Sequence, residues 1–274
     1  MQIGIIGQGF VGNAIYQKFK KYYDILTYDI VPGKGNSTED ETMKCDVVFV
    51  CLPTPMTFEG DCYSGFVEEA IDKISSKQTC KTVVIKSTIL PGTTERLNKQ
   101  YRKDLQIVFN PEFLTEANAV QDFENQNRII LGGPRPATTQ LKQIFSKVFP
   151  KAHIIKTGST HAELVKYFTN CFLSTKVSFA NEMYQLATAL NVDYDKVVEY
   201  ATLDSRLGDS HWAVPGPDGD FGFGGHCFPK DLAAIIKLCN TLDINPTVLN
   251  AVNKKNNEVR RDRDWEKMEG RAVV

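Results

Sequence analysis

The sequence predicts the α/β fold class, with a doubly wound parallel sheet followed by an all-helical domain. Three observations predict it: a short apolar strand that runs into a glycine-rich turn, a repeated alternation of strands and helices, and long helical patterns from about Ser159 onward. We therefore expect an α/β domain over residues 1–158 and a helical domain over residues 159–274.

The first element is a β-branched run from Gln2 to Ile6 that stops at Gly7 and reads as a buried strand. The turn that follows carries Gly7, Gly9 and Gly12 at the spacing of the dinucleotide fingerprint. In that fingerprint the first glycine permits the turn, the second admits the pyrophosphate, and the third lets helix and strand pack closely. This pattern predicts a Rossmann-like domain.

A helix from about Phe10 to Lys21 would direct its N-terminal N–H groups, near Phe10 and Val11, at the phosphates. The next strand, Ile25 to Asp29, ends on a carboxylate about 20 positions after the turn, as the fingerprint requires. Asp29 would accept hydrogen bonds from the adenosine ribose and repel a 2′-phosphate, which favours NAD over NADP. Lys34 is the only cation nearby, and the alternative is that Asp29 only caps a turn.

Residues 31–44 read as a polar loop with at most a short helix, and the strand–helix alternation then continues. Thr54 (in Pro53-Thr54-Pro55), Thr88 and Glu112 fall at the ends of strands, where open α/β sheets bind their ligands. The expected strands are Asp46–Leu52, Thr82–Lys86, Gln106–Phe109, Arg128–Leu131 and His153–Ile155. The helices expected between them are Ser64–Ser76, Arg96–Arg102 and Thr138–Phe149.

From Thr160 to Leu190 the pattern is a helix apolar around much of its surface, which predicts burial between domains or between subunits. Three further helices are expected, at Tyr194–Leu203, Pro229–Leu242 and Pro246 to about Lys267. The tail from Lys254 to Arg271 has dense charges of both signs, and we expect it to be a solvated helix face.

The composition excludes several function classes. The 274 residues have a net charge of -1, which gives no reason to expect nucleic acid or an anionic membrane as partner, so a small-molecule ligand fits better. Seven cysteines without CxxC or Cys/His spacing argue against disulfides and against a metal site. Without a visible signal peptide or membrane span, a cytoplasmic protein is expected.

The glycine-rich segment 222–231 ends on Cys227, immediately before a helix opened by Pro229 and close to Lys230 and Asp231. A helix N-terminus and a cation both favour the thiolate, so Cys227 is a candidate nucleophile. The alternative is that the glycines are only a turn and Cys227 a small core residue.

Four segments together resemble the nucleotide-sugar dehydrogenases, the family that includes UDP-glucose 6-dehydrogenase and GDP-mannose dehydrogenase. They are GQGFVG at the start, NPEFLTEA at 110–117, AELVKYFTNCFLSTKVSFANE at 162–182 and FGFGGHCFPKD at 221–231. The Phe-Pro-Lys-Asp ending is most similar to the UDP-glucose enzymes, although His226 stands where a serine is usual. The resemblance implies two successive NAD-dependent oxidations of a primary alcohol to a carboxylate, UDP-glucose to UDP-glucuronate.

The resemblance also implies roles for individual residues. Cys227 would form a thiohemiacetal and then a thioester. Lys166 and Asn170, at i and i+4 on one helix, would donate to an oxyanion, and Lys166 with Asp231 would organise a water. Glu116 would act as general base toward the thioester.

Further matches fall on the cofactor and the substrate. On the cofactor side the resemblance implies Pro53, Thr54, Thr88, Glu112 and Lys230, and it places Thr88 among the catalytic residues as well. On the substrate side it implies Arg206, the loop residues Phe221, Phe223 and Gly224, and also Phe113, Leu114, Glu116 and Lys230. Lys166 and Asn170 are expected to contact the substrate as well.

The chain departs from the family because a second Rossmann-like domain would begin where it stops, which leaves the choice of nucleotide base in doubt. GDP-mannose and UDP-N-acetylhexosamines therefore stay open as substrates. Two alternatives also remain: a two-electron dehydrogenase of the β-hydroxyacid type, and a non-catalytic NAD-binding protein. The apolar helix 160–190 predicts a homodimer.

Overall fold

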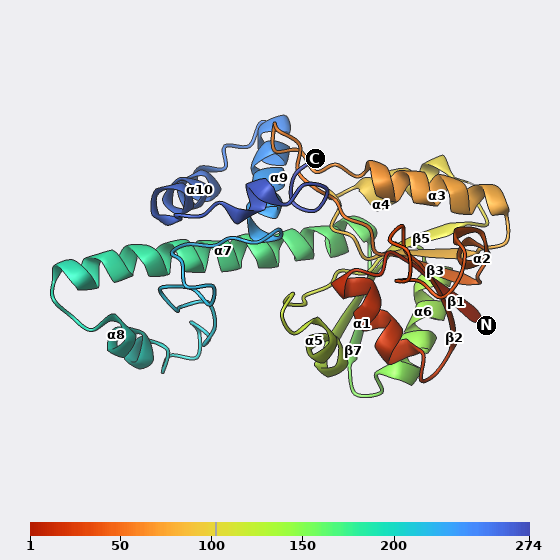
Figure 1. Cartoon of the computed structure of the whole chain (residues 1–274), viewed down its shortest axis with the longest axis horizontal. Helices are drawn as coiled ribbons and strands as arrows, with labels where there is room; N and C mark the ends of the chain where they lie inside the picture. The colour runs from red at the N-terminus through yellow and green to blue at the C-terminus, as the bar shows by residue number, and fades with distance from the viewer. Residues whose placement is uncertain (102) are drawn as a thin grey trace. The chain divides into compact units, whose positions relative to one another are not determined.

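The computed structural model describes residues 1–101 and 103–274, which form two compact units (Figure 1). The first, here called the sheet unit, comprises Met1–Thr54 and Ser64–Lys166. The second, the helical unit, comprises Pro55–Tyr63 and Tyr167–Val274. Arg102, the expected end of one helix, lies outside the described residues.

The sheet unit confirms the predicted fold class. Its described residues form a seven-stranded sheet in the order β2-β1-β3-β4-β5-β6-β7, parallel except where β6 meets β5 at Phe109 and Gly132. Because β1 lies between β2 and β3, the strand order reverses beside the glycine turn that follows β1. The strands are β1 Gln2–Ile6, β2 Asp24–Tyr28, β3 Val47–Val50, β4 Thr82–Ile85, β5 Gln106–Phe109, β6 Arg128–Gly132 and β7 His153–Thr157.

Strands β1 and β3 to β6 are mostly apolar because both faces of the sheet are covered there, whereas the edge strand β7 is largely exposed. In β3, Val47 and Phe49 pack into one core with α1, α5 and α6, whereas Val48 and Val50 pack into the other with α2, α3 and α4 (Figure 1). The helices are α1 Phe10–Phe19, α2 Glu39–Met43, α3 Gly65–Lys77, α4 Thr93–Gln100, α5 Ala119–Asn125 and α6 Arg135–Val148.

The helical unit is built on α7, Ser159–Ala189, whose first turns belong to the sheet unit. It continues through α8 Tyr194–Ala201, α9 Phe228–Thr241, α10 Thr247–Val259 and the 3-10 helix η1 Asp264–Lys267. Along α7, Phe168, Phe172, Phe179 and Leu186 are each at least half exposed, so the chain itself leaves this apolar stripe uncovered.

The predicted helix from Pro246 to about Lys267 is wrong beyond Val259. The tail that was expected to be a solvated helix face is α-helical only as far as Val259, although most of its charged side chains are exposed. The chain turns at Arg260, whose buried guanidinium contacts Asp218 at 2.6 Å and Asp264 at 3.3 Å. Trp265 in η1 is buried as well. These long-range contacts outweigh the local helical pattern.

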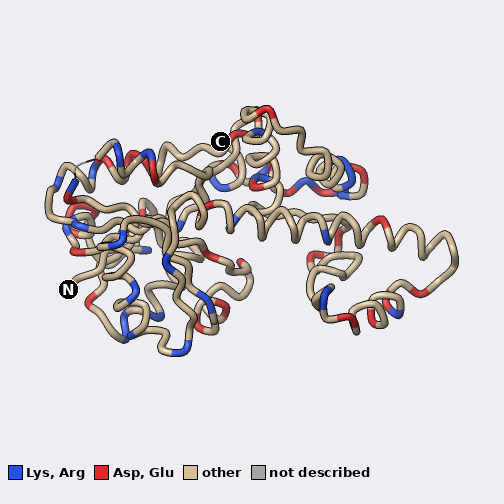
Figure 2. The backbone as a smooth tube through the Cα atoms, turned by 180° about the vertical axis from the view of Figure 1, so that it is seen from behind, with Lys and Arg blue, Asp and Glu red and all other residues tan. Residues whose placement is uncertain are grey.

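Charges of both signs are interspersed along the backbone of each unit (Figure 2). Among the described residues, no helix is both long and apolar enough to cross a membrane.

Candidate active site

The glycine turn after β1 has the shape that the fingerprint requires. Gly7 has a φ of +91°, and a Cβ there would collide with the carbonyl oxygen of Cys51. A Cβ on Gly12 would collide with the carbonyl oxygen of Gly7, so helix and turn pack as closely as backbones can. Around Gly9, by contrast, no described atom lies within 4 Å of a Cβ position. The turn is therefore closed on two sides and open at its middle glycine, as a pyrophosphate would need.

Asp29 follows β2 directly and is held in place by the backbone. Its Oδ2 accepts from the backbone N of Gln8, in the glycine turn, at 2.6 Å, and its Oδ1 accepts from that of Val31 at 2.8 Å. Phe10 and Val11, the first residues of α1, are half-buried, while Lys34 is exposed. The turn, the first turn of α1 and Asp29 thus fit the phosphate and ribose parts of a dinucleotide.

At the carboxyl ends of β4 and β5, a buried ion pair joins two predicted residues. The ammonium of Lys166 on α7 donates to the Glu112 carboxylate and to the Glu112 main-chain carbonyl, each at 2.8 Å. Burial by itself would raise the pKa of Glu112, but the Lys166 charge and its hydrogen bond outweigh burial and lower it. Thr54 and Thr88 are buried at the ends of β3 and β4, and Pro53 is exposed.

The residues after Glu112 lie partly in the open. The Phe113 ring is half-buried and has the Arg128 guanidinium 4.3 Å from its centroid, and the Leu114 backbone N donates to Glu112 at 2.7 Å. Glu116 is exposed. This segment therefore carries one carboxylate inward, on Glu112, and one outward, on Glu116.

Lys86 lies beside the same pair and was not predicted as a site residue from the sequence. It follows β4 directly, is 3% exposed, and donates to Asn110 Oδ1 at 3.0 Å and to the Pro111 carbonyl at 3.3 Å. A lysine ending an otherwise apolar strand was the signal that could have identified it, because lysine is rarely buried.

In the helical unit, Cys227 is the N-cap of α9, a position in which the helix N-terminus favours a thiolate. One turn on, Lys230 and Asp231 form a buried ion pair with Nζ and Oδ1 2.6 Å apart. Asn170 on α7 donates from Nδ2 to the other carboxylate oxygen, also at 2.6 Å. The predicted residues Cys227, Lys230, Asp231 and Asn170 are thus brought together, whereas Lys166 contacts Glu112 in the sheet unit.

The electrostatics of this cluster depend on one lysine. Burial alone would lower the pKa of Lys230, but the charge of Asp231, with further contributions from Cys227 and Cys62, raises it. Lys230 therefore remains an ammonium near the Cys227 thiol. Cys62, in the segment Pro55–Tyr63, was missed because no local pattern connects it to α9.

The glycine-rich loop before Cys227 is held from behind by side chains. The backbone N of Gly222 donates to Asn181 at 3.1 Å, that of Phe223 to Asn256 at 2.7 Å, and that of Gly225 to Asp264 at 3.0 Å. A Cβ on Gly224 would collide with the Arg260 guanidinium. The loop is thus held by hydrogen bonds, and close packing requires glycine at 222 and 224, whereas Gly225 has open space around its Cβ position and a φ of +70°.

Three predicted substrate residues differ in exposure: Phe221 and Phe223 belong to the glycine-rich segment, whereas Arg206 lies in the loop after α8. Phe223 is buried edge-on against Phe228, with the ring centroids 5.9 Å apart, and Phe221 is half-buried. Arg206 is exposed and pairs with Asp204. Of the three, only Arg206 presents a charged group fully to solvent.

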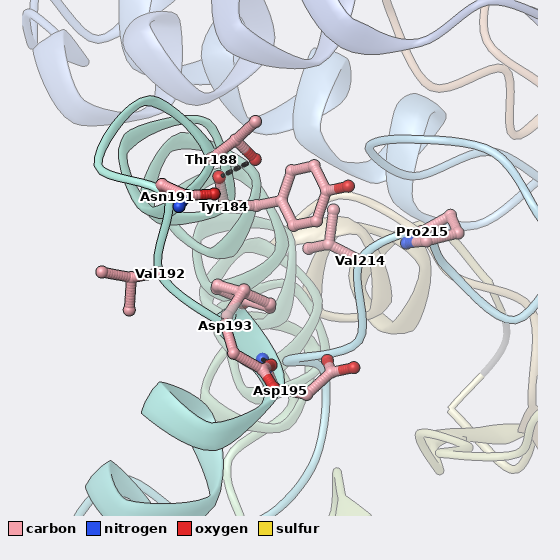
Figure 3. A pocket seen from close by; sticks show the side chains of 9 residues that line it. Tyr184, Thr188, Asn191, Val192, Asp193, Asp195, Val214 and Pro215 are labelled. Carbon is pink, nitrogen blue, oxygen red and sulfur yellow. Dashed lines mark hydrogen bonds between the residues drawn. The ribbon is translucent and has the colours of Figure 1, made fainter.

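A cavity of about 580 Å³ lies elsewhere in the helical unit, between the end of α7, the start of α8 and Val214-Pro215 (Figure 3). Tyr184 and Asp193 line it, and none of the predicted site residues does. The cavity is therefore separate from the Cys227 cluster.

Comparison with known proteins identifies both units. Residues 34–152 match the NAD binding domain, and residues 160–258 the central domain, of the UDP-glucose/GDP-mannose dehydrogenase family. The predicted cofactor, NAD, is thereby confirmed.

Individual relatives agree with this assignment. UDP-glucose 6-dehydrogenase AglM of Haloferax volcanii is 32% identical over 92% of this chain and 68% of its own length. GDP-mannose 6-dehydrogenase of Pseudomonas syringae pv. tomato is 30% identical over 85% of this chain and 56% of its own length. The structure of a UDP-glucose dehydrogenase from Pyrobaculum islandicum matches 94% of this chain and 68% of that one, with 29% identity and a TM-score of 0.84. The chain spans about half the length of other relatives, such as the 51% covered in Rickettsia bellii.

Proposed function

Because this chain belongs to the UDP-glucose/GDP-mannose dehydrogenase family, we propose that it oxidises a nucleotide sugar with NAD, converting UDP-glucose to UDP-glucuronate. One observation carries the proposal: Cys227 caps α9 beside a buried Lys230–Asp231 pair that Asn170 holds in place. A thiol in that position serves as a covalent nucleophile, which the second oxidation needs.

The cofactor half of the proposal is supported by the sheet unit. The open middle of the glycine turn and the first turn of α1 would hold the pyrophosphate, and Asp29 the ribose. When bound, NAD supplies the acceptor for a hydride. Thr88 and Glu112, at neighbouring strand ends, are the residues we assign to the nicotinamide side.

The chemical half rests on the helical unit. The first oxidation turns the sugar's primary alcohol into an aldehyde, and the Cys227 thiolate then adds to the aldehyde carbon to give a thiohemiacetal. Loss of a second hydride yields a thioester, and water, activated by Glu116, hydrolyses it to the carboxylate and frees Cys227. Two hydrides leave per sugar, so two NADH form. Lys166 and Asn170 stabilise the oxyanions, and Asp231 takes part in removing the alcohol proton.

The assignment of the nucleotide rests on similarity alone. Relatives at 30 to 34% identity include UDP-glucose and GDP-mannose 6-dehydrogenases. Each of these relatives is longer than the part of it that this chain matches. We favour UDP-glucose because the Phe228-Pro229-Lys230-Asp231 ending resembles those enzymes most. Arg206, exposed in the loop after α8, is assigned to the substrate.

We also infer a homodimer built on the stripe of Phe168, Phe172, Phe179 and Leu186. These side chains are 50 to 72% exposed at helical spacing, an arrangement that a second copy of α7 would cover. Light scattering at micromolar concentration tests this inference, and a monomer would contradict it.

The experiment that tests the function is an assay of NADH formation with UDP-glucose, GDP-mannose and UDP-N-acetylhexosamines. UDP-glucose should give two NADH per sugar and an acidic product detected by mass spectrometry. One NADH per substrate, with an aldehyde or ketone as product, would favour the β-hydroxyacid type of dehydrogenase. NAD binding without turnover of any sugar would favour a non-catalytic protein.

A further inference from the structure

Lys86 is a buried cation for which the proposed reaction has no use. Lys86 is 3% exposed, and both of its hydrogen-bond acceptors, Asn110 Oδ1 and the Pro111 carbonyl, are uncharged. Burying an ammonium without a directly bonded carboxylate is costly, and a methionine of similar length would avoid that cost. A lysine buried at such a position indicates a role beyond packing.

The charged and titratable groups around Lys86 come from three elements. Glu112 follows β5 and attracts the Lys86 charge, whereas Lys166 on α7 repels it. Cys51, which follows β3, is a neutral thiol, because burial raises its pKa to about 12. Burial lowers the pKa of Lys86 to about 8, and Glu112 opposes that effect only in part.

The two acceptors of Lys86 immediately precede Glu112 in the chain. Lys86 binds the turn at Asn110 and Pro111, and Lys166 binds it at Glu112 through both the carbonyl and the carboxylate. Asn110 is fixed in addition by its Nδ2, which donates to the Ile130 carbonyl at 2.8 Å. Two lysines from different elements therefore hold three consecutive residues.

We propose that Lys86 is a positioning residue: it holds the turn Asn110–Glu112 so that the carbonyl and the carboxylate of Glu112 both meet the Lys166 ammonium. The importance of this for turnover rests on the proposed function, but the positioning itself does not. Lys86 acts through Glu112 and contacts neither substrate nor cofactor.

The first test does not depend on activity. In Lys86→Met, the turn loses its hold, and Lys166 should react with acetic anhydride about tenfold faster, which corresponds to about 1.4 kcal/mol of lost protection. Peptide mass spectrometry measures the modification of Lys166, with exposed Lys99 in the same sample as internal standard. Lys81→Met, which removes an exposed lysine next to the same strand, is the matched control and should leave Lys166 unchanged.

The proposal would be overturned if Lys86→Met has a native circular dichroism spectrum and its Lys166 reacts within about twofold of the wild-type rate. A twofold ratio corresponds to less than about half a kcal/mol of lost protection. If Lys86→Met does not fold, Lys86→Leu, which also lacks a donor for the turn, is judged by the same criterion. Failure of both variants to fold would assign Lys86 to stability alone and also overturn it.

The second test is a double-mutant cycle in the NADH assay, with NAD and UDP-glucose. Lys86→Met should lower kcat about tenfold with KM for NAD within about twofold, and should add little in a Glu112→Gln background, because both changes disturb one pair. Full additivity would overturn the route through Glu112. If the wild-type chain makes no NADH, the proposed function fails while the labelling result still decides the role of Lys86.

Discussion

The two units each bury a lysine–carboxylate pair, and the pairs are assembled differently. In the helical unit, Lys230 and Asp231 are adjacent in sequence on the first turn of α9. In the sheet unit, Lys166 reaches Glu112 from another element, 54 positions away along the chain. A pair within one turn can be recognised in the sequence, whereas a pair between elements depends on the topology of the sheet.

The comparison also shows that burial alone does not set the charge of a lysine. Lys230 and Lys86 are both less than a tenth exposed, yet the pKa of Lys230 is raised and that of Lys86 is lowered to about 8. The difference lies in the bonded partner, which is a carboxylate for Lys230 and two neutral oxygens for Lys86. In the helical unit, the charges of Lys230 and Asp231 cancel beside the Cys227 thiol. In the sheet unit, Lys86 and Lys166 face the single carboxylate of Glu112, so this cluster has one cation in excess.

The largest expected effect tests whether the Cys227 cluster of the helical unit supplies the nucleophile. Cys227→Ser should lower net formation of UDP-glucuronate about a thousandfold or more, because a hydroxyl at this position is a far weaker nucleophile. NADH release with UDP-glucose measures the change. Cys239→Ser, on the same helix α9, is the control and should turn over normally. Net turnover surviving in Cys227→Ala would show that the helical cluster is not the nucleophilic one.

The next largest effect concerns the Lys230–Asp231 ion pair of the helical unit. Asp231→Ala leaves the Lys230 ammonium buried without its carboxylate and removes the acceptor of Asn170, so the free energy of unfolding should fall by about 3–5 kcal/mol. Urea denaturation followed by circular dichroism measures it. Lys237→Met, which breaks only exposed ion pairs with Glu59 and Asp61, should leave the denaturation midpoint unchanged. A midpoint equally unchanged in Asp231→Ala would mean that the pair is not buried in solution.

Lys86, whose two hydrogen-bond acceptors are neutral, should make the free energy of unfolding depend on pH. Because the pKa of Lys86 is about 8 when folded and about 10.5 when unfolded, the unfolded chain binds more protons between these values, and stability rises with pH. From pH 7 to pH 10, wild type should gain about 2 kcal/mol of unfolding free energy relative to Lys86→Met, which lacks this titration. Denaturation curves for both proteins across that range measure it. Parallel pH profiles for wild type and Lys86→Met would contradict a lowered pKa of Lys86 and so remove its difference from Lys230.

The smallest effect tests the cofactor side of the sheet unit alone. Asp29→Asn removes the negative charge that disfavours a 2′-phosphate, and should narrow the preference for NAD over NADP by about tenfold. Binding of each cofactor by tryptophan or NADH-type fluorescence measures the preference. Asp40→Asn, an exposed carboxylate on α2, should leave it unchanged. A preference equally unaffected in Asp29→Asn would restrict Asp29 to its hydrogen bonds with Gln8 and Val31.

Much of the fold was predictable because its signals are local. The strand Gln2–Ile6 and the glycine spacing after it match β1 and its turn, and the alternation of apolar strands follows the sheet. The short helix α5 escaped prediction because only Ala119 and Phe123 of its seven residues are buried, too few for a periodic pattern. The end of α10 was misplaced because Arg260 leaves the helix for carboxylates about 40 positions earlier in the chain, at Asp218 and Asp220.

For the proposed site, the sequence by itself indicated the residues whose chemistry depends on their immediate neighbours: the glycine turn, Cys227 at the start of α9, and the adjacent Lys230 and Asp231. Only the tertiary structure decided which distant groups meet them, namely Asn170 with Asp231 and Lys166 with Glu112. It alone also revealed Lys86, because the partners of a buried charge come from strands that are neighbours in the sheet and far apart in the chain. Helix caps and turns are set by local backbone geometry, whereas the compensation of a buried charge is set by packing.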